Sequence, residues 1–325
     1  MRFCHVRFFA IGLIVVMGST AHSKDDNPAY NNAKEAGADY DVQGEYVGML
    51  EDGNRWAAQV IADGDGKFTA VGYMGGLPGD GWSRGDTSAS LKGKRDGDEV
   101  IFEGAEFVLR IKDGQLGVES VEGDSFGSLK KVERKSDTLG KKPPANAKVL
   151  FDGSNVDHWT NGKIIEGKLL GATNVESKDK LGDHKLHLEF RTPFMPKSRG
   201  QGRGNSGVYL QGRYEVQVLD SFGLEGKDNE CGGIYSISPP DVNMCLPPLA
   251  WQTYDIDFTA AKYDGDKKIK NARATIKHNG VVIHDDLELP NGTPGRHPEA
   301  PGPQVLFLQD HSNPVAYRNI WVVEE

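Results

Sequence analysis

The chain has 325 residues, with 47 Asp and Glu against 38 Lys and Arg and a formal net charge of −9. This acidic balance excludes the basic surface that binds nucleic acid or an anionic membrane. The charge suits a neutral or polar small ligand, and it equally suits a soluble secreted protein without one.

The first 23 residues predict a signal peptide. Arg2 and Arg7 precede a short apolar run over residues 8–17, and small residues at Ala21 and Ser23 fit a cleavage site. The apolar run is shorter than the roughly 20 residues that cross a bilayer. We therefore expect cleavage after Ser23, no membrane span, and a periplasmic or secreted protein.

The next segments predict a leader and a small β-domain. Residues 24–39 are polar and predict a flexible leader. Residues 40–132 alternate short apolar-polar runs with hairpin dipeptides such as Asp96-Gly97 and Asp113-Gly114. This spacing indicates an all-β domain, whose role the pattern does not reveal.

A charged segment over residues 133–148, with Pro143-Pro144 inside it, predicts an interdomain linker. The second domain covers residues 149–325 and contains at least eight strand patterns, two of them joined by Asn279-Gly280. We find no long helical periodicity. The chain is therefore predicted to be all-β, with a two-sheet sandwich after the small domain.

The segment Gly204–Asp220 predicts a β-hairpin with a turn at Gly212-Arg213. The alternation directs Val208 and its equivalents to the core, whereas Tyr209, Glu215 and Gln217 point to the opposite face. Glu and Gln at alternate positions indicate a face open to water, which in a concave sheet can hold a carbohydrate.

Two cysteines remain after removal of the signal peptide. Cys231 and Cys245 form an even pair in an exported chain and are not in a CxxC spacing. An oxidising compartment favours their pairing, so we predict one disulfide.

Several motifs resemble one family in the same order along the chain. They are LFDGSNVDHW, NSGVYLQGRYEVQVLD, CGGIYSISPP, WQTYDIDF, HNGVVIHD and LQDHSNPVAYRNIWVVEE. The region from about residue 148 to the C-terminus resembles the 3-keto-disaccharide hydrolase domain family. The resemblance implies a concanavalin A-like jelly-roll β-sandwich. It does not extend to the preceding small domain.

The resemblance implies action on sugars whose C3 hydroxyl is already a ketone. The ketone acidifies the hydrogen on C2, so a base can remove it, the glycosidic oxygen leaves from C1, and water then adds. Such a site needs a base and a donor or cation for the enolate oxygen. The resemblance implies a glycoside or oligosaccharide substrate and is compatible with a divalent metal cation, and we expect no nucleotide or organic cofactor.

Glu215 is the first candidate for the catalytic or metal-binding carboxylate, although a solvated sheet residue is the plain alternative. Laminarinase-like jelly rolls supply two carboxylates from alternate positions of one strand, whereas this chain has Gln217 at the neighbouring position. An amide cannot serve as nucleophile or acid. This departure favours elimination over double-carboxylate hydrolysis.

His311 is the candidate for base, acid or second metal ligand, because its reference pKa suits proton transfer. The remaining candidates, for substrate binding, are Asn205, Tyr209, Gln217, Asp220, Tyr235 and Arg318. Several of these residues have a structural alternative. Asn205 could serve turn geometry, the two tyrosines could pack in the core, and Arg318 could form an ion pair. Three other functions stay open: a non-catalytic carbohydrate-binding module, a conventional glycoside hydrolase, and a structural or adhesion role.

Overall fold

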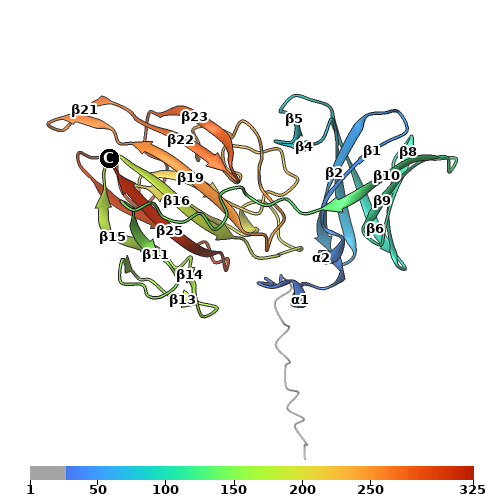
Figure 1. Ribbon diagram of the computed structural model, residues 1–325, viewed down its shortest axis with the longest axis horizontal. Coiled ribbons are helices and arrows are strands. Elements are labelled where there is room, and N and C mark those ends of the chain that lie inside the picture. The colour runs from blue at the N-terminus through green and yellow to red at the C-terminus, as the bar shows by residue number, and fades with distance from the viewer. Residues whose placement is uncertain (1–26) are drawn as a thin grey trace, which may run out of the picture.

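The computed structural model describes residues 27–325, and it consists almost entirely of β-strands (Figure 1). A closed barrel formed by the N-terminal part lies beside a two-sheet sandwich formed by the C-terminal part. The all-β prediction is confirmed. The predicted signal peptide lies outside the described residues. Among residues 27–325, no helix has the length and apolar character needed to cross a membrane.

The barrel is an antiparallel meander of eight strands in which β10 closes onto β1. Its strands are β1 (Gly44–Met49), β2 (Arg55–Gly64), β3 (Lys67–Met74), β6 (Ser88–Asp96), β7 (Glu99–Glu103), β8 (Phe107–Lys112), β9 (Gln115–Ser120) and β10 (Ser125–Val132). The loop between β3 and β6 contains β4 (Leu77–Pro78) and β5 (Gly81–Trp82). Closure leaves the sheet without free edges, which explains how strands this short form a stable unit.

The predicted leader is folded from Tyr30 onward. Tyr30 exchanges two backbone hydrogen bonds with Phe194 of the sandwich, each 2.9 Å long. The short helices α1 (Ala33–Ala36) and α2 (Ala38–Val42) follow, and the Tyr40 ring meets Phe194 edge-on. The described part of the predicted leader, residues 27–39, thus contains helical turns, and the partly buried Tyr30 ring packs against the barrel core. Its flexibility stays a prediction.

The sandwich packs an eight-stranded sheet on a five-stranded sheet. The larger sheet contains β11 (Lys148–Phe151), β13 (Ile164–Ile165), β14 (Leu169–Gly171), β16 (His184–Arg191), β19 (Gln252–Thr259), β22 (Ala272–His278), β23 (Val281–Leu289) and β25 (Ala316–Glu324). The smaller sheet contains β12 (Trp159–Thr160), β15 (Val175–Leu181), β17 (Ser206–Leu210), β18 (Tyr214–Val218) and β24 (Gln304–Leu308). A separate hairpin, β20 (Lys262–Asp264) with β21 (Lys267–Lys270), and the 3-10 turn η1 (Gly200–Gly202) complete the domain.

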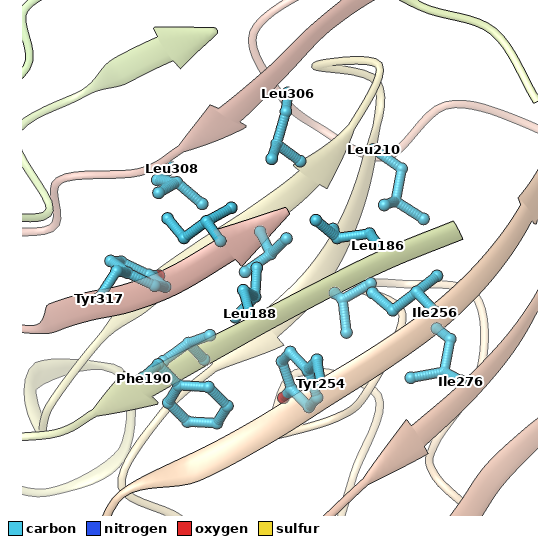
Figure 2. Close-up of a cluster of buried hydrophobic side chains, with 14 of the residues drawn as sticks. Leu186, Leu188, Phe190, Leu210, Tyr254, Ile256, Ile276, Leu306, Leu308 and Tyr317 are labelled. Carbon is cyan, nitrogen blue, oxygen red and sulfur yellow. The ribbon is translucent and has the colours of Figure 1, made fainter. Parts of the chain in front are cut away.

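Alternate residues of the two sheets form one hydrophobic core (Figure 2). Leu186, Leu188 and Phe190 of β16 face Leu306 and Leu308 of β24 across the sandwich, and all five are buried. Because side chains alternate between faces, the residues between them on β24 and β17 lie on the outer face of the smaller sheet. This alternation decides where the candidate site is.

The segment between the two folded units lies against the larger sheet. β10 ends at Val132 and β11 begins at Lys148. Between them, Thr138 donates a hydrogen bond to Asp255 over 2.6 Å, and the Gly140 amide donates to Glu189 over 2.6 Å. The middle of the predicted linker segment is thus bound to the larger sheet, whereas residues 142–146 are exposed.

Cys231 and Cys245 are free, buried thiols, so the disulfide prediction is wrong. The two thiols interact through a hydrogen bond, and the Cys231 sulfur also lies 3.3 Å from the Tyr254 hydroxyl. The prediction rested on the even number of cysteines and on the expected oxidising compartment, but neither determines the distance and orientation of the two side chains. Here each sulfur finds polar partners in the core without a covalent bond.

Candidate active site

The predicted hairpin is formed by β17 and β18, with Tyr209 opposite Glu215 and Gly207 opposite Gln217. Gln211 and Gly212 adopt left-handed backbone angles in the turn, as a tight hairpin requires. The predicted core face is confirmed, since Val208 and its equivalents belong to the core cluster. Tyr209, Glu215 and Gln217 therefore point to the outer face of the smaller sheet.

One row of side chains crosses this outer face at right angles to the strands. Glu215 is beside Tyr209, Tyr209 is beside Phe307, and Phe307 is beside Glu176. A β-bridge between Val216 and Ile234 adds Tyr235 at the other end, and the Tyr235 amide approaches the Glu215 carbonyl at 3.4 Å. The row is therefore Tyr235, Glu215, Tyr209, Phe307 and Glu176.

The outer face around Glu215 is covered, which corrects the expectation of a water-exposed face. Only 4% of Glu215 is exposed. The segment between β23 and β24 folds back over the hairpin: Thr293 Oγ1 accepts from the Glu215 amide over 2.9 Å, and Gly295 lies against the Tyr209 ring. The long loop replaces water as the partner of this face.

Burial of Glu215 changes its acidity. Desolvation disfavours the charged carboxylate and raises the pKa of Glu215 to about 7, although a hydrogen bond with the Tyr209 hydroxyl opposes the shift. Burial also raises the pKa of Tyr209, so its hydroxyl keeps its proton at neutral pH. Glu215 can therefore gain or lose a proton near pH 7, while Tyr209 stays a hydrogen-bond donor.

Gly207 leaves the space into which the Glu215 carboxylate extends. A Cβ atom at this position would lie 2.4 Å from Glu215 Oε1 and 2.8 Å from the Tyr209 ring. These distances are shorter than van der Waals contacts. The glycine is needed here for the close approach of two neighbouring side chains rather than for its backbone angles.

Two amide side chains beside Glu215 present unpartnered oxygens. Asn205 and Gln217 both direct their NH2 groups to Gln201 Oε1, over 3.1 and 3.3 Å. The side-chain oxygens of Asn205 and Gln217 are buried and have no protein partner. A buried acceptor without a donor is costly, and hydroxyl groups of a ligand would satisfy both.

The segment that contains His311 borders this site. Gln309 donates a hydrogen bond to the Tyr209 hydroxyl over 3.1 Å, and Asn313 accepts from the Asn205 amide over 2.7 Å. His311 lies between these two anchors, and its side chain is exposed. In the described part of the chain, His311 has no hydrogen bond or ion pair with Glu215, so its proposed role stays a prediction.

Asp220 lies beside the site but is committed to a buried ion pair. Its carboxylate accepts from Arg203 Nε over 2.7 Å, and both side chains are buried. The Arg203 guanidinium also reaches the Ala62 carbonyl of β2 at 3.5 Å. Asp220 thus holds the 199–205 segment in place and is unavailable for direct substrate binding.

Arg318 lies on the opposite side of the sandwich. Its guanidinium pairs with Glu189 over 2.6 Å and covers the Trp251 ring at 3.9 Å. Both partners belong to the outer face of the larger sheet. The expectation that Arg318 shares a face with Glu215 is therefore wrong, because β25 belongs to the larger sheet and β18 to the smaller one, so their outward side chains lie on opposite sides of the sandwich.

Sequence reasoning missed three residues that complete the site: Gln201, Thr293 and Gln309. Gln309 could have been found, since it directly precedes Asp310 and His311 in a motif that was singled out. Gln201 and Thr293 lie in irregular segments without periodicity. Only the folded chain brings them to Glu215.

The residues around Glu215 do not form a ligand set for a divalent metal. Within residues 27–325, no three His, Cys, Asp or Glu side chains gather in a way that could hold a metal ion. The expectation of a metal on Glu215 and His311 therefore has no support from the geometry of these side chains.

Comparison with known proteins gives the family. Residues 146–323 match the family described as a 3-keto-alpha-glucoside-1,2-lyase-like domain. The chain belongs to this family. Because the match covers the sandwich and stops short of the barrel, the resemblance predicted from the motifs is confirmed over the same region. Among curated proteins, none matches this chain.

Two solved structures are similar to the sandwich. A candidate glycosyl hydrolase from Parabacteroides distasonis is 30% identical, covers 56% of this chain and 85% of its own, and has a TM-score of 0.50. A second candidate glycosyl hydrolase from the same organism is 15% identical, covers 55% and 94%, and has a TM-score of 0.40. The family match and the first of these two structures show that the sandwich is a carbohydrate hydrolase-like domain of the 3-keto-glucoside lyase-like family.

Proposed function

We propose that this protein is an exported enzyme that cleaves the glycosidic bond of 3-keto-glycosides by elimination followed by hydration. The observation that carries the proposal is the buried carboxyl group of Glu215, whose pKa of about 7 suits a general base at neutral pH. Family membership supports the substrate class. The predicted signal peptide supports export to the periplasm or medium.

In the proposed reaction, the Glu215 carboxylate removes the proton from C2 of the keto sugar. The electron pair forms a C1–C2 double bond as the C1–oxygen bond breaks, and the leaving oxygen receives the proton. Water then adds its hydroxyl to C1 and a proton to C2. Tyr209 hydrogen-bonds the base, and Gln309 donates to Tyr209, so these two donors would stabilise the enolate oxygen at C3.

The amide oxygens of Asn205 and Gln217 would accept hydrogen bonds from sugar hydroxyls. Tyr235, half-buried at the end of the row, would pack against a sugar ring. His311 would donate or accept a proton at the leaving group only after moving toward the substrate. The proposed steps use no metal ion.

The spacing of carboxylates argues against a conventional glycoside hydrolase. Glu176 is the second carboxylate in the Glu215 row, three strands away, so strand spacing puts the two roughly 14 Å apart. Conventional hydrolysis uses carboxyl groups roughly 5 to 9.5 Å apart. Glu176 also forms ion pairs with Arg296 and His297.

The test is to incubate the purified protein with a 3-keto-disaccharide and with its unoxidised parent, each with and without EDTA, in deuterated water. We expect monosaccharide release and deuterium at C2 only from the keto sugar. Glu215→Gln should lower kcat by roughly 10²–10⁴-fold and remove deuterium exchange. A protein that binds the sugar, releases nothing and is unaffected by Glu215→Gln would be a binding module, and the proposal would be wrong.

The pH profile provides a second measurement. Because Glu215 must be ionised to act as the base, kcat/KM should rise with pH and level off above about 7. A profile that is flat through pH 6–8, or that falls, would contradict the assignment of Glu215 as the base.

A further inference from the structure

The interior of the N-terminal barrel contains a cavity that the Glu215 site does not use. Its volume is about 490 Å³, within the range of roughly 300–1,000 Å³ that small-molecule sites occupy. Leu50, Ser88 and Phe107 are among the residues that line the cavity. The cavity therefore opens at the end of the barrel where β6 and β8 begin. A barrel of eight strands is wide enough to be filled by side chains or to hold one small ligand.

Small residues at one level of the barrel create the cavity. Ala58 of β2 pairs with Gly72 of β3, and Gly72 pairs with Ala89 of β6, so three neighbouring strands have almost no side chain at this height. All three line the cavity. Toward the other mouth, the buried rings of Tyr46 and Phe68 fill the interior. The barrel is therefore packed in one half and hollow in the other.

The walls of the cavity are apolar, and the charged groups among its lining residues are both acidic. Trp56, Phe107 and Phe126 provide aromatic surface, and Phe126 is 41% exposed. Asp52 and Glu106 are the two charged lining residues, and Asp52 accepts a hydrogen bond from the Trp56 indole over 3.3 Å. An anionic head group, such as a fatty-acid carboxylate, would meet like charge there.

We propose that the barrel is a binding site for one uncharged, largely apolar small molecule, of the size of a two- or three-ring aromatic compound. Apolar walls provide the binding free energy by removing the ligand surface from water. The acidic side chains provide selectivity against anions. The proposal is independent of the chemistry at Glu215, because only strands and connecting loops of the barrel line the cavity.

The experiment uses two fluorescent probes that differ by one sulfonate group. N-phenyl-1-naphthylamine is uncharged, and 8-anilino-1-naphthalenesulfonate is an anion of similar shape. With the full chain, we expect saturable binding of the uncharged probe at one site per chain, with energy transfer from Trp56. The anionic probe should bind at least about tenfold more weakly because of repulsion by the rim carboxylates.

Gly72→Leu should remove binding of the uncharged probe by filling the cavity. A Cβ at Gly72 would meet only the Ala89 carbonyl at 3.8 Å, an ordinary contact, so the barrel should fold normally. Gly117→Leu is the matched control: its Cβ also meets only a carbonyl at 3.8 Å, but Gly117 lies between the inward residues Leu116 and Val118 and is absent from the lining. Circular dichroism and the melting temperature show whether each variant folds.

Absence of saturable binding of the uncharged probe would overturn the proposal. So would equal binding by folded Gly72→Leu and Gly117→Leu variants. Should Gly72→Leu fail to fold, Ala89→Leu at the exposed mouth serves as the second cavity-filling variant. Equal affinity of the two probes for the unaltered protein would overturn the stated preference for an uncharged ligand.

Discussion

Glu215 illustrates how one residue can be costly to the fold and useful to the site. Its burial beneath the Thr293–His297 segment removes the carboxylate from water, and this desolvation sets its pKa near neutrality. Gly207 makes the burial possible, because any larger residue would occupy the position of the carboxylate. The two residues therefore act as a pair: Glu215 provides the carboxyl group, and Gly207 leaves the space that this group occupies.

Glu215→Gln should stabilise the protein at alkaline pH. The folded-state pKa of Glu215 lies above its unfolded value, so its stabilising contribution is complete below pH 4.5 and is lost as the pH rises through about 7. The raised pKa corresponds to about 3 kcal/mol, which the amide variant should recover at pH 8. Urea unfolding at pH 5 and pH 8 measures the difference.

Glu176→Gln is the control with the opposite sign. Burial alone would raise the pKa of Glu176, but hydrogen bonds from Arg296 and His297 outweigh it and lower the pKa. Its stabilising contribution is present above pH 4.5 and is lost as the pH falls, so the amide variant should be less stable than the parent at pH 8. Stabilisation by both amide variants at pH 8 would contradict this reasoning.

Gly207→Ala should reduce activity far more than stability. The added methyl group must displace the end of the Glu215 side chain, which can move, while the strand pairing is retained. We expect a loss in kcat of at least about tenfold, since misplacement of a catalytic group by about 1 Å is sufficient for such losses. Gly182→Ala, where a Cβ meets nothing within 4 Å, is the control and should behave as the parent protein.

At the scale of secondary-structure elements, irregular segments determine the site. The β17–β18 hairpin presents Glu215, but the 199–205 segment provides Gln201 and the segment after β24 provides Gln309. The buried Asp220–Arg203 pair fixes the first of these segments against the end of β18. Loss of that pair should therefore affect both stability and the position of the amide cluster.

Asp220→Asn should destabilise the protein by about 3–5 kcal/mol, because it leaves the buried Arg203 cation without a counter-charge. Asp80→Asn removes a carboxylate from the exposed Arg55 pair and should cost less than about 1 kcal/mol. Chemical denaturation of the two variants side by side gives the comparison. Equal costs would show that burial of the Asp220 pair has no energetic consequence.

At the scale of the whole molecule, the barrel and the sandwich are joined by contacts as well as by the chain. Arg84, in the loop between β3 and β6, donates to the carbonyl groups of Gly226 and Pro240 over 2.8 and 2.9 Å. Ile61 of β2 belongs to the core cluster of the sandwich. Together with the contacts of Thr138 and Gly140 with the larger sheet, these contacts favour unfolding of both parts in one transition.

Arg84→Ala should weaken this interface and cost about 1.5–3 kcal/mol, because its carbonyl partners lose a charged donor. We expect the single thermal transition to broaden or divide into two. Arg55→Ala, which removes an exposed ion pair within the barrel, is the control and should leave one transition. Calorimetry that shows two transitions in the parent protein would contradict the coupling of the two parts.

The sequence by itself determined the features that depend on neighbours along the chain. Alternation with a period of two fixed the faces of β17 and β18 and identified Glu215, while dipeptides such as Asn279-Gly280 located hairpins. Ordered motifs identified the family. Each of these signals arises from residues a few positions apart, where backbone geometry leaves few alternatives.

Only the tertiary structure decided what depends on contacts between distant segments. The partner of the Glu215 amide is Thr293, 78 positions away, so no local pattern could reveal that the predicted wet face is buried. For the same reason, the predictions from the sequence placed Arg318 on the wrong face, paired two cysteines that are free thiols, and did not identify the barrel cavity. Burial, register shifts and barrel closure are set by packing of the whole chain, and these in turn set the acidity of Glu215.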